Sequence, residues 1–518
     1  MFEELLKAYM KLGGSPREIN EDILQLIPDR CTAQDLRNFL SNSGDEQDHV
    51  ALLSAAHTVT LKISNDVKEQ EPTDESNSDE ALCDIADRTS SLILPLCSGD
   101  SLDEDETNYT ILQHKGELGL LILTTLTKLS PKASPLHLPP STLLRITAFT
   151  NPTDLWTTAE SSALSQSLLS SQLEHLNASQ VQSLIVQDIL TSFLRPLFSK
   201  SRPATITASG RKAEFIEPSR YDGAARESPE TKPWKYAHRY AVTVFEWAVE
   251  HADSTLLQSH WPLFTPVLLT LIDEPGPTAL KIRSLGILRA FWARCPAGLM
   301  QNTGLAEVIE QAVFPAVLYL PSLTPEDESL EILGAAYPAL TEMAGLTVDR
   351  PLVVTEVITT EKQTLIQKPT HGITEGQRKL LDKIIREGIM VGYHHSKEHD
   401  FIPMLSEIMT DPFGAKHPPT LASGIKLLQT ILRNCWPRIP HYCNEVIKIL
   451  MLCWLVIEDE ETFSHDSPIA NDLKSGLTQA AGMLSAIMKA AQIDFRKRVD
   501  PLIEKGPFLD KLFGEITS

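Results

Sequence analysis

Histidine side chains come close together at one point in the sequence where they could bind a metal ion. The stretch YHHSKEH places His395 and His399 one helical turn apart, with His394 adjacent. Two imidazoles at this spacing hold zinc only with a third ligand and with partners that orient the rings. A solvated helix end explains these histidines with fewer assumptions, so the sequence predicts no metal site here.

A second group, in the stretch CWPRIPHYC, combines Cys435, His441 and Cys443, with Cys453 farther along the chain. Cys435 continues an apolar helical spacing, and an unpaired cysteine behaves as a small hydrophobic residue. Packing in the core is therefore favoured over metal ligation. The chain has seven scattered cysteines and no Cys-x-x-Cys pair, which is typical of reduced thiols in a cytosolic or nuclear protein.

Motifs for catalysis or cofactor binding are missing from the sequence. The stretch GPTALKIRS lacks the Gly-Lys-Ser/Thr ending of a phosphate-binding loop, and there is no Gly-x-Ser-x-Gly or His-Glu-x-x-His motif. The acidic pair Glu326 and Asp327 precedes a predicted helix, where it complements the helix dipole. The sequence thus predicts a protein with no catalytic residues and no cofactor. An enzyme with an unrecognised site is the weaker alternative.

The elements that would position any site are helices that carry apolar residues in steps of three and four. Each is preceded by a shorter apolar helix and a turn rich in Asp, Glu and Pro. Such two-helix units, which cannot bury their apolar faces alone, are typical of a stacked α-solenoid of the HEAT or armadillo kind. We therefore predict an all-α, HEAT/armadillo-like solenoid of degenerate repeats. The four apolar stripes are Ile282/Leu285/Leu288/Trp292, Leu330/Leu333/Tyr337/Leu340/Ala344, Leu421/Ile425/Leu428/Leu432/Cys435 and Leu473/Leu477/Ala480/Leu484/Ile487.

One stretch does not fit a purely helical pattern. RPLVVTEVIT, residues 350–359, is rich in β-branched residues and could form a strand. An extended linker between helices is the interpretation that we favour over the strand.

The charge of the chain limits its partners and is unevenly distributed. The 518 residues carry a formal net charge of −22, which disfavours direct nucleic-acid binding because phosphate contact needs a basic face. Two acidic segments, at about 65–80 and 98–108, are predicted to be solvated loops. A regulatory role for these acidic loops is the alternative, because Ser76 and Ser101 each have an acidic residue three positions later.

Two features of the hydropathy pattern indicate where in the cell the protein is found. The N-terminal stretch MFEELLKAYMKLGG lacks the apolar block of a signal peptide. The most apolar run, ILMLCWLVI, is about half as long as a membrane span requires. We therefore expect a soluble protein of the cytoplasm and nucleus that binds no membrane.

An irregular arm, residues 199–235, separates an N-terminal helical region (1–198) from the C-terminal repeats (236–518). Residues 200–235 hold eight basic and five acidic residues, against the charge of the rest of the chain. Four prolines restrict this arm, and Trp234 is its large apolar residue. We predict that the arm docks on the chain's own repeats or on a partner subunit; a flexible tether is the alternative. The predicted contact residues are Arg211, Lys212, Lys232, Trp234, Lys235 and Tyr236.

The arm and its surroundings also resemble a known family. LFSKSRPATITASGRKAEF, followed by KPWKYAHRYAVTVFEWAVEHAD, is similar to the family of the second Tel-two-interacting protein, the smallest subunit of the TTT (Triple-T) complex. PSLTPEDESLEILGAAYPALTEMA and HPPTLASGIKLLQTILRNCWPRI resemble its C-terminal helical repeats, in the form found in filamentous fungi. The resemblance covers roughly residues 193–488 and leaves the first 190 residues unmatched.

The resemblance implies a non-enzymatic scaffold. In that family the complex, with two other TTT subunits, assists the ninety-kilodalton heat-shock chaperone in maturing phosphatidylinositol-3-kinase-related kinases, and in fungi it also occurs in the ASTRA assembly. A different HEAT-repeat adaptor, in nuclear transport or trafficking, is the alternative, because a fold alone does not determine function.

Overall fold

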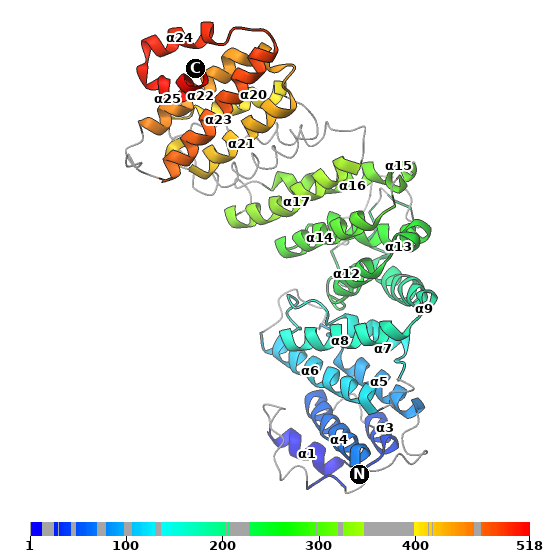
Figure 1. The fold of residues 1–518 in the computed structure, drawn as a ribbon. Coiled ribbons are helices and arrows are strands. Elements are labelled where there is room, and N and C mark those ends of the chain that lie inside the picture. Colours follow the sequence, from blue (N-terminus) through cyan, green and yellow to red (C-terminus); the bar gives the residue numbers. More distant parts are fainter. Residues whose placement is uncertain are drawn as a thin grey trace. The chain divides into compact units, whose positions relative to one another are not determined.

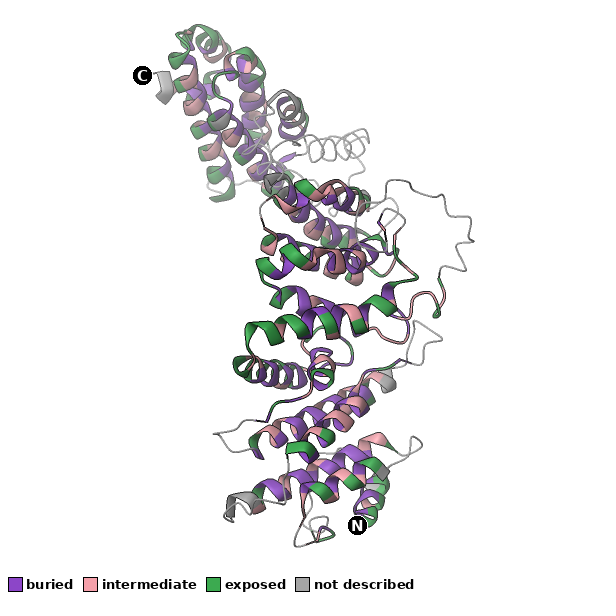
Figure 2. Cartoon of the chain, turned by 90° about the vertical axis from the view of Figure 1, so that its right-hand side faces the viewer, coloured by how far each residue is buried: buried purple, intermediate pink, exposed green. Residues whose placement is uncertain are grey.

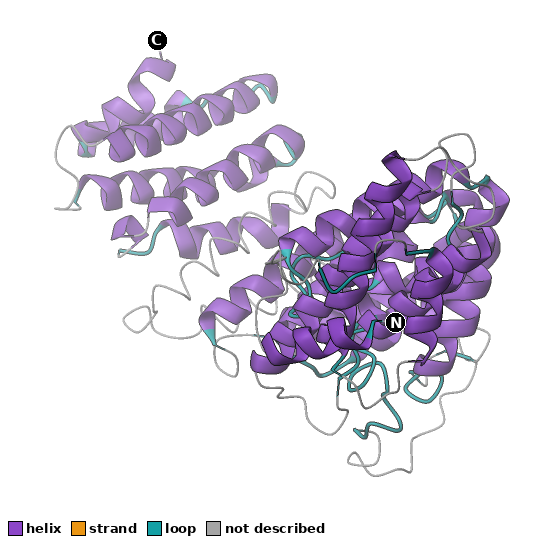
Figure 3. Cartoon of the chain, turned by 90° about the horizontal axis from the view of Figure 1, so that it is seen from below, coloured by secondary structure: helices purple, strands orange, loops and turns teal. Residues whose placement is uncertain are grey.

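The computed structural model describes most of the chain, with gaps between helices and one long gap after residue 346. The described residues are 2–12, 25–28, 31–42, 48–69, 79–97, 106–129, 136–203, 206–207, 227–296, 298–319, 325–346, 398–412, 414–416, 418–459 and 468–517. Helices dominate these segments, and no β-strand forms among them (Figure 3). The prediction of an all-α protein is confirmed. Residues 350–359, where a strand or linker was considered, lie outside the described residues.

The chain divides into two compact units that do not follow the three-part division expected from composition. One unit comprises Met1–Thr270 with Ala293–Leu299, and the other comprises Leu271–Trp292 with Met300–Ser518. The first unit therefore contains both the N-terminal helical region and the described ends of the arm. The helix that follows the arm begins in this unit too.

The first unit begins as a stack of helices that pack in neighbouring pairs, α3 with α4, α5 with α6 and α7 with α8, and also on the corresponding helix of the next pair. Thus α3 packs on α5, α4 on α6, α5 on α7 and α6 on α8 (Figure 1). This alternation builds two layers, which is compatible with an α-solenoid. The helices are α1 (Glu3–Leu12), α3 (Ala33–Asn42), α4 (His49–Glu69), α5 (Asp79–Ile93), α6 (Glu106–Leu129), α7 (Pro140–Thr147) and α8 (Ala159–His175).

Local signals explain where several of these helices begin. Thr32 precedes α3, and its hydroxyl accepts a hydrogen bond from the backbone N–H of Asp35 at 3.3 Å, as expected for a helix N-cap. Thr158 and Ser161 form a reciprocal capping box at the start of α8. The buried faces of the stacked helices lie toward one another (Figure 2).

Parts of the two segments predicted to be acidic loops are helical. Residues 65–69 form the last turns of α4, residues 79–80 begin α5, and residues 106–108 begin α6. A polar, acidic composition does not by itself end a helix, because Lys and Glu are good helix formers. Acidic residues are also favourable in a first helical turn, where Asp79 and Glu80 stand. Ser76 and Ser101 lie outside the described residues.

The helical segment that leads to the arm is divided into three parts. α9 (Ala178–Ser183) leads into a π-helix, Leu184–Leu194, and then into α10 (Arg195–Phe198). The wider winding of the π-helix shows in the hydroxyl of Thr191, which donates to the carbonyl of Val186, five residues back, at 2.6 Å. This π-helix packs against α7 and α12 (Ala241–His251). It therefore joins the stack to the helix that follows the arm.

The next helices are α13 (Ser254–Asp273), α14 (Thr278–Arg294), α15 (Leu299–Thr303), α16 (Leu305–Val313) and α17 (Glu326–Leu346). Most of α14 and α15 and all of α16 and α17 belong to the second unit. The apolar stripes predicted here are largely confirmed. Leu285, Leu288 and Trp292 are buried in α14, and Leu333, Tyr337 and Leu340 are buried in α17. Ile282 and Leu330 at the helix starts are only half-buried.

The same alternating pattern recurs near the C-terminus, where α20 packs on α22, α21 on α23 and α23 on α25. These helices are α20 (Glu398–Met409), α21 (Pro418–Asn434), α22 (Cys443–Glu458), α23 (Pro468–Ala490), α24 (Arg496–Lys505) and α25 (Asp510–Thr517). Every residue of the stripe Leu421–Cys435 is buried, as is that of Leu473–Leu484, and Ile487 is half-buried. The helical period was therefore assigned correctly.

One helical run among the described residues, Ile439–Glu458, is long and apolar enough to cross a membrane. It contains the run ILMLCWLVI. Cys443, Val446, Leu450 and Trp454 are buried in it, and α22 packs against α20 and α23. Its apolar side chains are thus used in packing within the second unit.

Candidate functional site

The arm's predicted contact residues divide between described and undescribed parts of the chain. Arg211 and Lys212 lie outside the described residues. Lys232, Trp234, Lys235 and Tyr236 are described, and all four pack near the point where the arm meets α12. Partner binding by these residues stays a prediction.

Trp234 is the centre of this contact. Its side chain is 1% exposed, and its ring stacks on Phe198 with centroids 5.0 Å apart and planes 12° from parallel. The indole Nε1–H donates a hydrogen bond to the hydroxyl of Ser201 at 3.0 Å. Since Phe198 and Ser201 stand at the start of the arm and Trp234 at its end, these contacts hold the two ends of the arm together.

A second aromatic pair supports the first. Phe193 in the π-helix stacks on Tyr240, with ring centroids 5.6 Å apart. Burial raises the pKa of the Tyr240 hydroxyl to about 12, although the nearby charge of Arg145 lowers it. The phenol therefore stays neutral at physiological pH. We call the stacked pairs Phe198–Trp234 and Phe193–Tyr240 the arm clamp.

The two lysines of the arm pair with a carboxylate of the same segment. Lys232 Nζ lies 2.5 Å from Glu227 Oε2, Lys235 Nζ forms an ion pair with Glu227 Oε1, and the Tyr236 hydroxyl donates to that oxygen at 3.3 Å. Burial alone would raise the pKa of Glu227, but the hydrogen bonds and charges of both lysines outweigh it and lower the pKa. Both lysines that were predicted to make contacts are thus paired with a carboxylate within the arm.

Further hydrogen bonds connect the end of the arm to the helical stack. The carbonyl of Ala237 accepts from the backbone N–H of Cys97 at 3.2 Å. Arg239 donates to the Tyr109 hydroxyl at 2.6 Å, which links the start of α12 to α6. Among described residues, then, the arm's C-terminal end is part of the first unit's packing.

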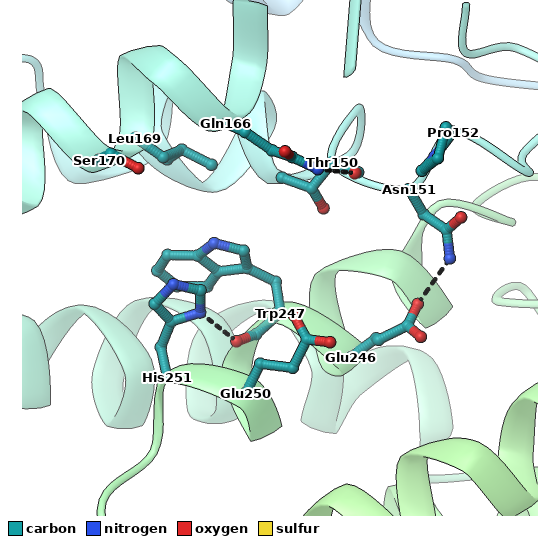
Figure 4. A pocket seen from close by; sticks show the side chains of 10 residues that line it. All are labelled: Thr150, Asn151, Pro152, Gln166, Leu169, Ser170, Glu246, Trp247, Glu250 and His251. Carbon is teal, nitrogen blue, oxygen red and sulfur yellow. Dashed lines mark hydrogen bonds between the residues drawn. The ribbon is translucent and has the colours of Figure 1, made fainter. Parts of the chain in front are cut away.

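A surface cleft lies in the same unit. It has a volume of about 400 Å³ and lies between α8 and α12, with the turn after α7 at one end (Figure 4). Gln166, Leu169 and Ser170 of α8 stand on one side and the α12 residues on the other. Its lining residues are Thr150, Asn151, Pro152, Gln166, Leu169, Ser170, Glu246, Trp247, Glu250 and His251.

Hydrogen bonds within the chain position the polar groups of this cleft (Figure 4). Asn151 Nδ2 donates to Glu246 Oε2 at 2.9 Å, and Gln166 Nε2 donates to the carbonyl of Thr150 at 2.9 Å. His251 stacks on Trp247 with centroids 4.2 Å apart, and its Nδ1 donates to the Trp247 carbonyl at 2.9 Å. Both the amides and the imidazole are therefore held in place by the chain itself.

The groups considered for metal binding do not come together in the described structure. His394 and His395 lie outside the described residues, and no cluster of three or more His, Cys, Asp or Glu side chains suited to a metal occurs among those that are described. Cys435, Cys443 and Cys453 are buried and form no disulfide, whereas His441 is exposed. Burial raises the pKa of the Cys453 thiol to about 12, so it stays protonated in the core.

Sequence reasoning missed three parts of these sites. Glu227 was counted only toward the net charge of the arm, although its position five and eight residues before the lysines could have suggested a pair. Phe198 was assigned to a helix without a partner for its ring. The cleft combines three segments with no shared motif, and no signal in the sequence pointed to it.

The fold and these surfaces define a helical scaffold whose described features suit contacts with other proteins. The model of the Tti2 family matches residues 142–409, a little over half of the chain, and a search of curated proteins finds no match. The chain belongs to the Tti2 family, that of Tel-two-interacting protein 2. Membership of this family implies a subunit of the TTT complex, with a role alongside chaperones in kinase maturation. The cleft and the arm both lie within the matched segment.

Proposed function

We propose that this chain is the non-enzymatic scaffold subunit of a TTT co-chaperone complex. It would bind the other two TTT subunits and, through them, the ninety-kilodalton heat-shock chaperone machinery. The clients would be newly made phosphatidylinositol-3-kinase-related kinases. We further propose that it joins the chromatin-linked ASTRA assembly, and that it works in both the cytoplasm and the nucleus.

The observation that carries this proposal is the family match over residues 142–409. That segment contains the whole arm, the cleft and the helices α12 to α17. The physical character of the described chain supports it. Stacked helices offer extended surfaces to other proteins.

Co-expression with the two larger TTT subunits tests the proposal. We expect all three chains to elute together in size-exclusion chromatography and to remain together when any one of them carries the affinity tag. Recovery of a Ran-like GTPase or of coat proteins from cells, with no association with the TTT subunits, would instead support an adaptor in nuclear transport or trafficking.

A separate measurement tests the claim that the subunit is non-enzymatic. Cells that lack the protein should lose kinase abundance, and a variant with the arm clamp intact but with the cleft carboxylates replaced should restore it to the extent that it still binds its partners. Restoration that tracks binding supports a scaffold. A variant that binds every partner normally but fails to restore kinase levels would point to an activity beyond scaffolding.

A further inference from the structure

Two connections between helices lie along the same edge of the second unit. One joins α21 to α22, and the other joins α23 to α24. Ile425 of α21 lies beside Gly476 of α23, and one helical turn farther along, Gln429 Nε2 donates to Gln479 Oε1 at 3.2 Å. α21 and α23 therefore run in the same direction, and their C-terminal ends lie at one edge of the unit.

Further contacts hold the two connections together. The short 3₁₀ helix Ile439–Tyr442, which lies in the first connection, packs against α23. Arg498 Nη1, in the first turn of α24, donates a hydrogen bond to Asn444 Oδ1, in the first turn of α22, at 2.6 Å. We call residues 433–445 and 489–498 together the basic edge.

The basic edge has a charge opposite to that of the chain as a whole. It holds six cations against two carboxylates, those of Glu445 and Asp494, in a chain whose formal net charge is −22. All of these charged residues are exposed. The six cations are Arg433, Arg438, Lys489, Arg496, Lys497 and Arg498.

Most of these cations are not neutralised by the described part of the chain. Arg433, Lys489, Arg496 and Lys497 form no ion pair among the described residues. Arg438 interacts with other groups of the chain, so it is not counted as an available charge. Four exposed positive charges are therefore open to a partner along this edge.

The first turn of α24 is electrostatically unfavourable in the free chain. A helix N-terminus carries a partial positive charge, which favours carboxylates and disfavours cations. α24 begins with Arg496, Lys497 and Arg498 and has no acidic residue in its first turn. Asp494, just before the helix, accepts from the backbone N–H of Lys497 at 3.3 Å and offsets only part of this charge. Carboxylates supplied by a partner would offset the rest.

Trp436 supplies an apolar group on the same edge. It lies two residues after the end of α21 and is 53% exposed. A single exposed apolar residue is common on protein surfaces and needs no explanation by itself. A tryptophan that stands among arginines is more informative, because Trp and Arg are among the residues most enriched at the energetic centres of protein interfaces.

We propose that the basic edge binds an acidic segment of a partner protein, with an apolar side chain of that segment packed against Trp436. A nucleic acid also combines negative charge with stacking surfaces. Its continuous row of phosphates, however, would extend beyond the edge onto a chain whose net charge is −22, whereas a short protein segment can confine its carboxylates to the edge. This inference goes beyond the complex proposed above, and its test requires only the present chain.

Selection of random short peptides, displayed against the immobilised full-length chain, tests the proposal. The library is first depleted on the variant Trp436→Ala with Arg496→Gln and Lys497→Gln, so that peptides recovered on the parent chain depend on the basic edge. We expect these peptides to combine Asp or Glu with an aromatic or aliphatic residue. Each is also synthesised with Asn and Gln in place of Asp and Glu, and this amide form should bind at least tenfold more weakly, or about 1.4 kcal/mol. Binding should weaken as salt is raised, since exposed charges are screened.

A matched pair of charge variants locates the binding. Arg496→Gln with Lys497→Gln should bind the recovered peptides at least tenfold more weakly. Lys505→Gln with Lys511→Gln makes the same change in net charge at exposed positions at the end of α24 and the start of α25, and should bind as the parent does. Because the first variant removes cations from a helix N-terminus, we expect it to melt no lower than the parent, so that weaker binding is not a result of unfolding.

A second matched pair tests the apolar contact. Trp436→Ala should weaken binding at least tenfold, as expected for a residue at the centre of an interface. Ile469→Ala truncates a residue that is 52% exposed at the start of α23, the end of that helix away from the basic edge, and should have no effect. Should Trp436→Ala fold poorly, the comparison of acidic and amide peptides on the parent chain still decides.

Several results would overturn the inference. These are a selection that yields no peptide or only peptides without acidic residues, equal binding of the acidic and amide forms, and equal binding by the two charge variants. Equal binding by Trp436→Ala and Ile469→Ala would contradict the apolar contact. Single-stranded RNA that binds the parent more tightly than every recovered peptide, and that is released by Arg496→Gln with Lys497→Gln, would assign the edge to nucleic acid instead.

Discussion

Replacing Trp234 by alanine should release the end of the arm from the first unit. The indole is 1% exposed, stacks on Phe198 and donates to Ser201, so the substitution leaves a cavity and removes a hydrogen bond. Core Trp→Ala substitutions cost about 3–5 kcal/mol. We expect a loss of that size in the free energy that holds residues 227–240 in place.

Hydrogen exchange is the assay of choice, because a chain with two packing units need not unfold in a single step. The amide of His238, which donates to the Pro233 carbonyl at 2.9 Å, reports on the docked segment. The amide of Val244, which donates to the Tyr240 carbonyl at 3.0 Å, reports on the start of α12. We expect both to exchange faster in Trp234→Ala, by about two orders of magnitude or more, with the amides of α21 unchanged.

Trp234→Phe provides the matched control, since it keeps an aromatic ring to stack on Phe198. It loses the Nε1–H bond and some volume, so the expected loss is smaller; the hydrogen bond alone contributes about 0.5–1.5 kcal/mol. Exchange rates for residues 227–240 that are the same in the parent and in Trp234→Ala would refute the assignment of Trp234 as the anchor of the arm.

A charge reversal separates docking of the arm from direct partner contact. Lys232→Glu with Lys235→Glu and Trp234→Ala should weaken assembly with the larger TTT subunits by tenfold or more, about 1.4 kcal/mol. Lys232→Glu with Lys235→Glu alone reverses the charges while keeping Trp234, and adding Glu227→Lys to that pair restores opposite charges within the arm. If binding recovers in that variant, the lysines act by positioning the arm. If hydrogen-exchange protection of the arm recovers in that variant but binding to the TTT subunits does not, the lysines contact the partner directly.

Three further predictions concern stability. Leu333→Asp places a charge at a fully buried position of α17, where an unpaired charge costs several kcal/mol; soluble yield and melting temperature should both fall, and a soluble variant with unchanged melting would contradict the burial. In α6, Gly119→Ala should destabilise the protein by about 1–3 kcal/mol because its new Cβ would overlap Ile93 of α5. Gly482→Ala, whose new Cβ meets nothing within 4 Å, should instead stabilise α23 by up to about 1 kcal/mol. Equal urea midpoints for the two variants would show that α5 can move to make room for the new methyl group without a loss of stability. Because the pKa of Glu227 is lowered in the folded chain, its ion pairs contribute fully to docking of the arm at pH values above the usual carboxyl pKa of 4.5. This contribution is lost as the pH falls through the lower pKa of the folded state. Protection of residues 227–240 from hydrogen exchange that increases on acidification would contradict this direction.

The helical faces were predictable from the sequence because burial imposes a repeat of three and four residues on any helix that packs on one side. Every residue of the stripe in α21 is buried, including Cys435, whose assignment as a core residue is confirmed. The ends of helices were predicted less well. Four of residues 65–69 are polar, yet the segment continues α4, because helical hydrogen bonds do not require an apolar side chain.

The sites were harder to predict because their contacts join distant segments. Trp234 could be identified as an apolar anchor because it is the large apolar residue of the arm. Its contact with Phe198 could not, because the two residues are 36 positions apart and meet only through the packing of the π-helix against α12. The charge of the arm was summed over the whole segment, which concealed that Glu227 offsets two of its lysines. Net charge describes long-range attraction, whereas contacts depend on individual pairs.

The arm clamp and the cleft lie in the same unit but differ in burial. Closing a long loop costs conformational entropy that grows only slowly with loop length, so two stacked aromatic pairs and an ion-paired carboxylate are sufficient to hold the ends of a long arm together. These contacts are mostly buried, and they therefore contribute to stability. The cleft keeps Glu250 and its rim exposed and is positioned by hydrogen bonds rather than filled by side chains. The cleft is thus preformed by hydrogen bonds of the chain itself, as small binding sites usually are.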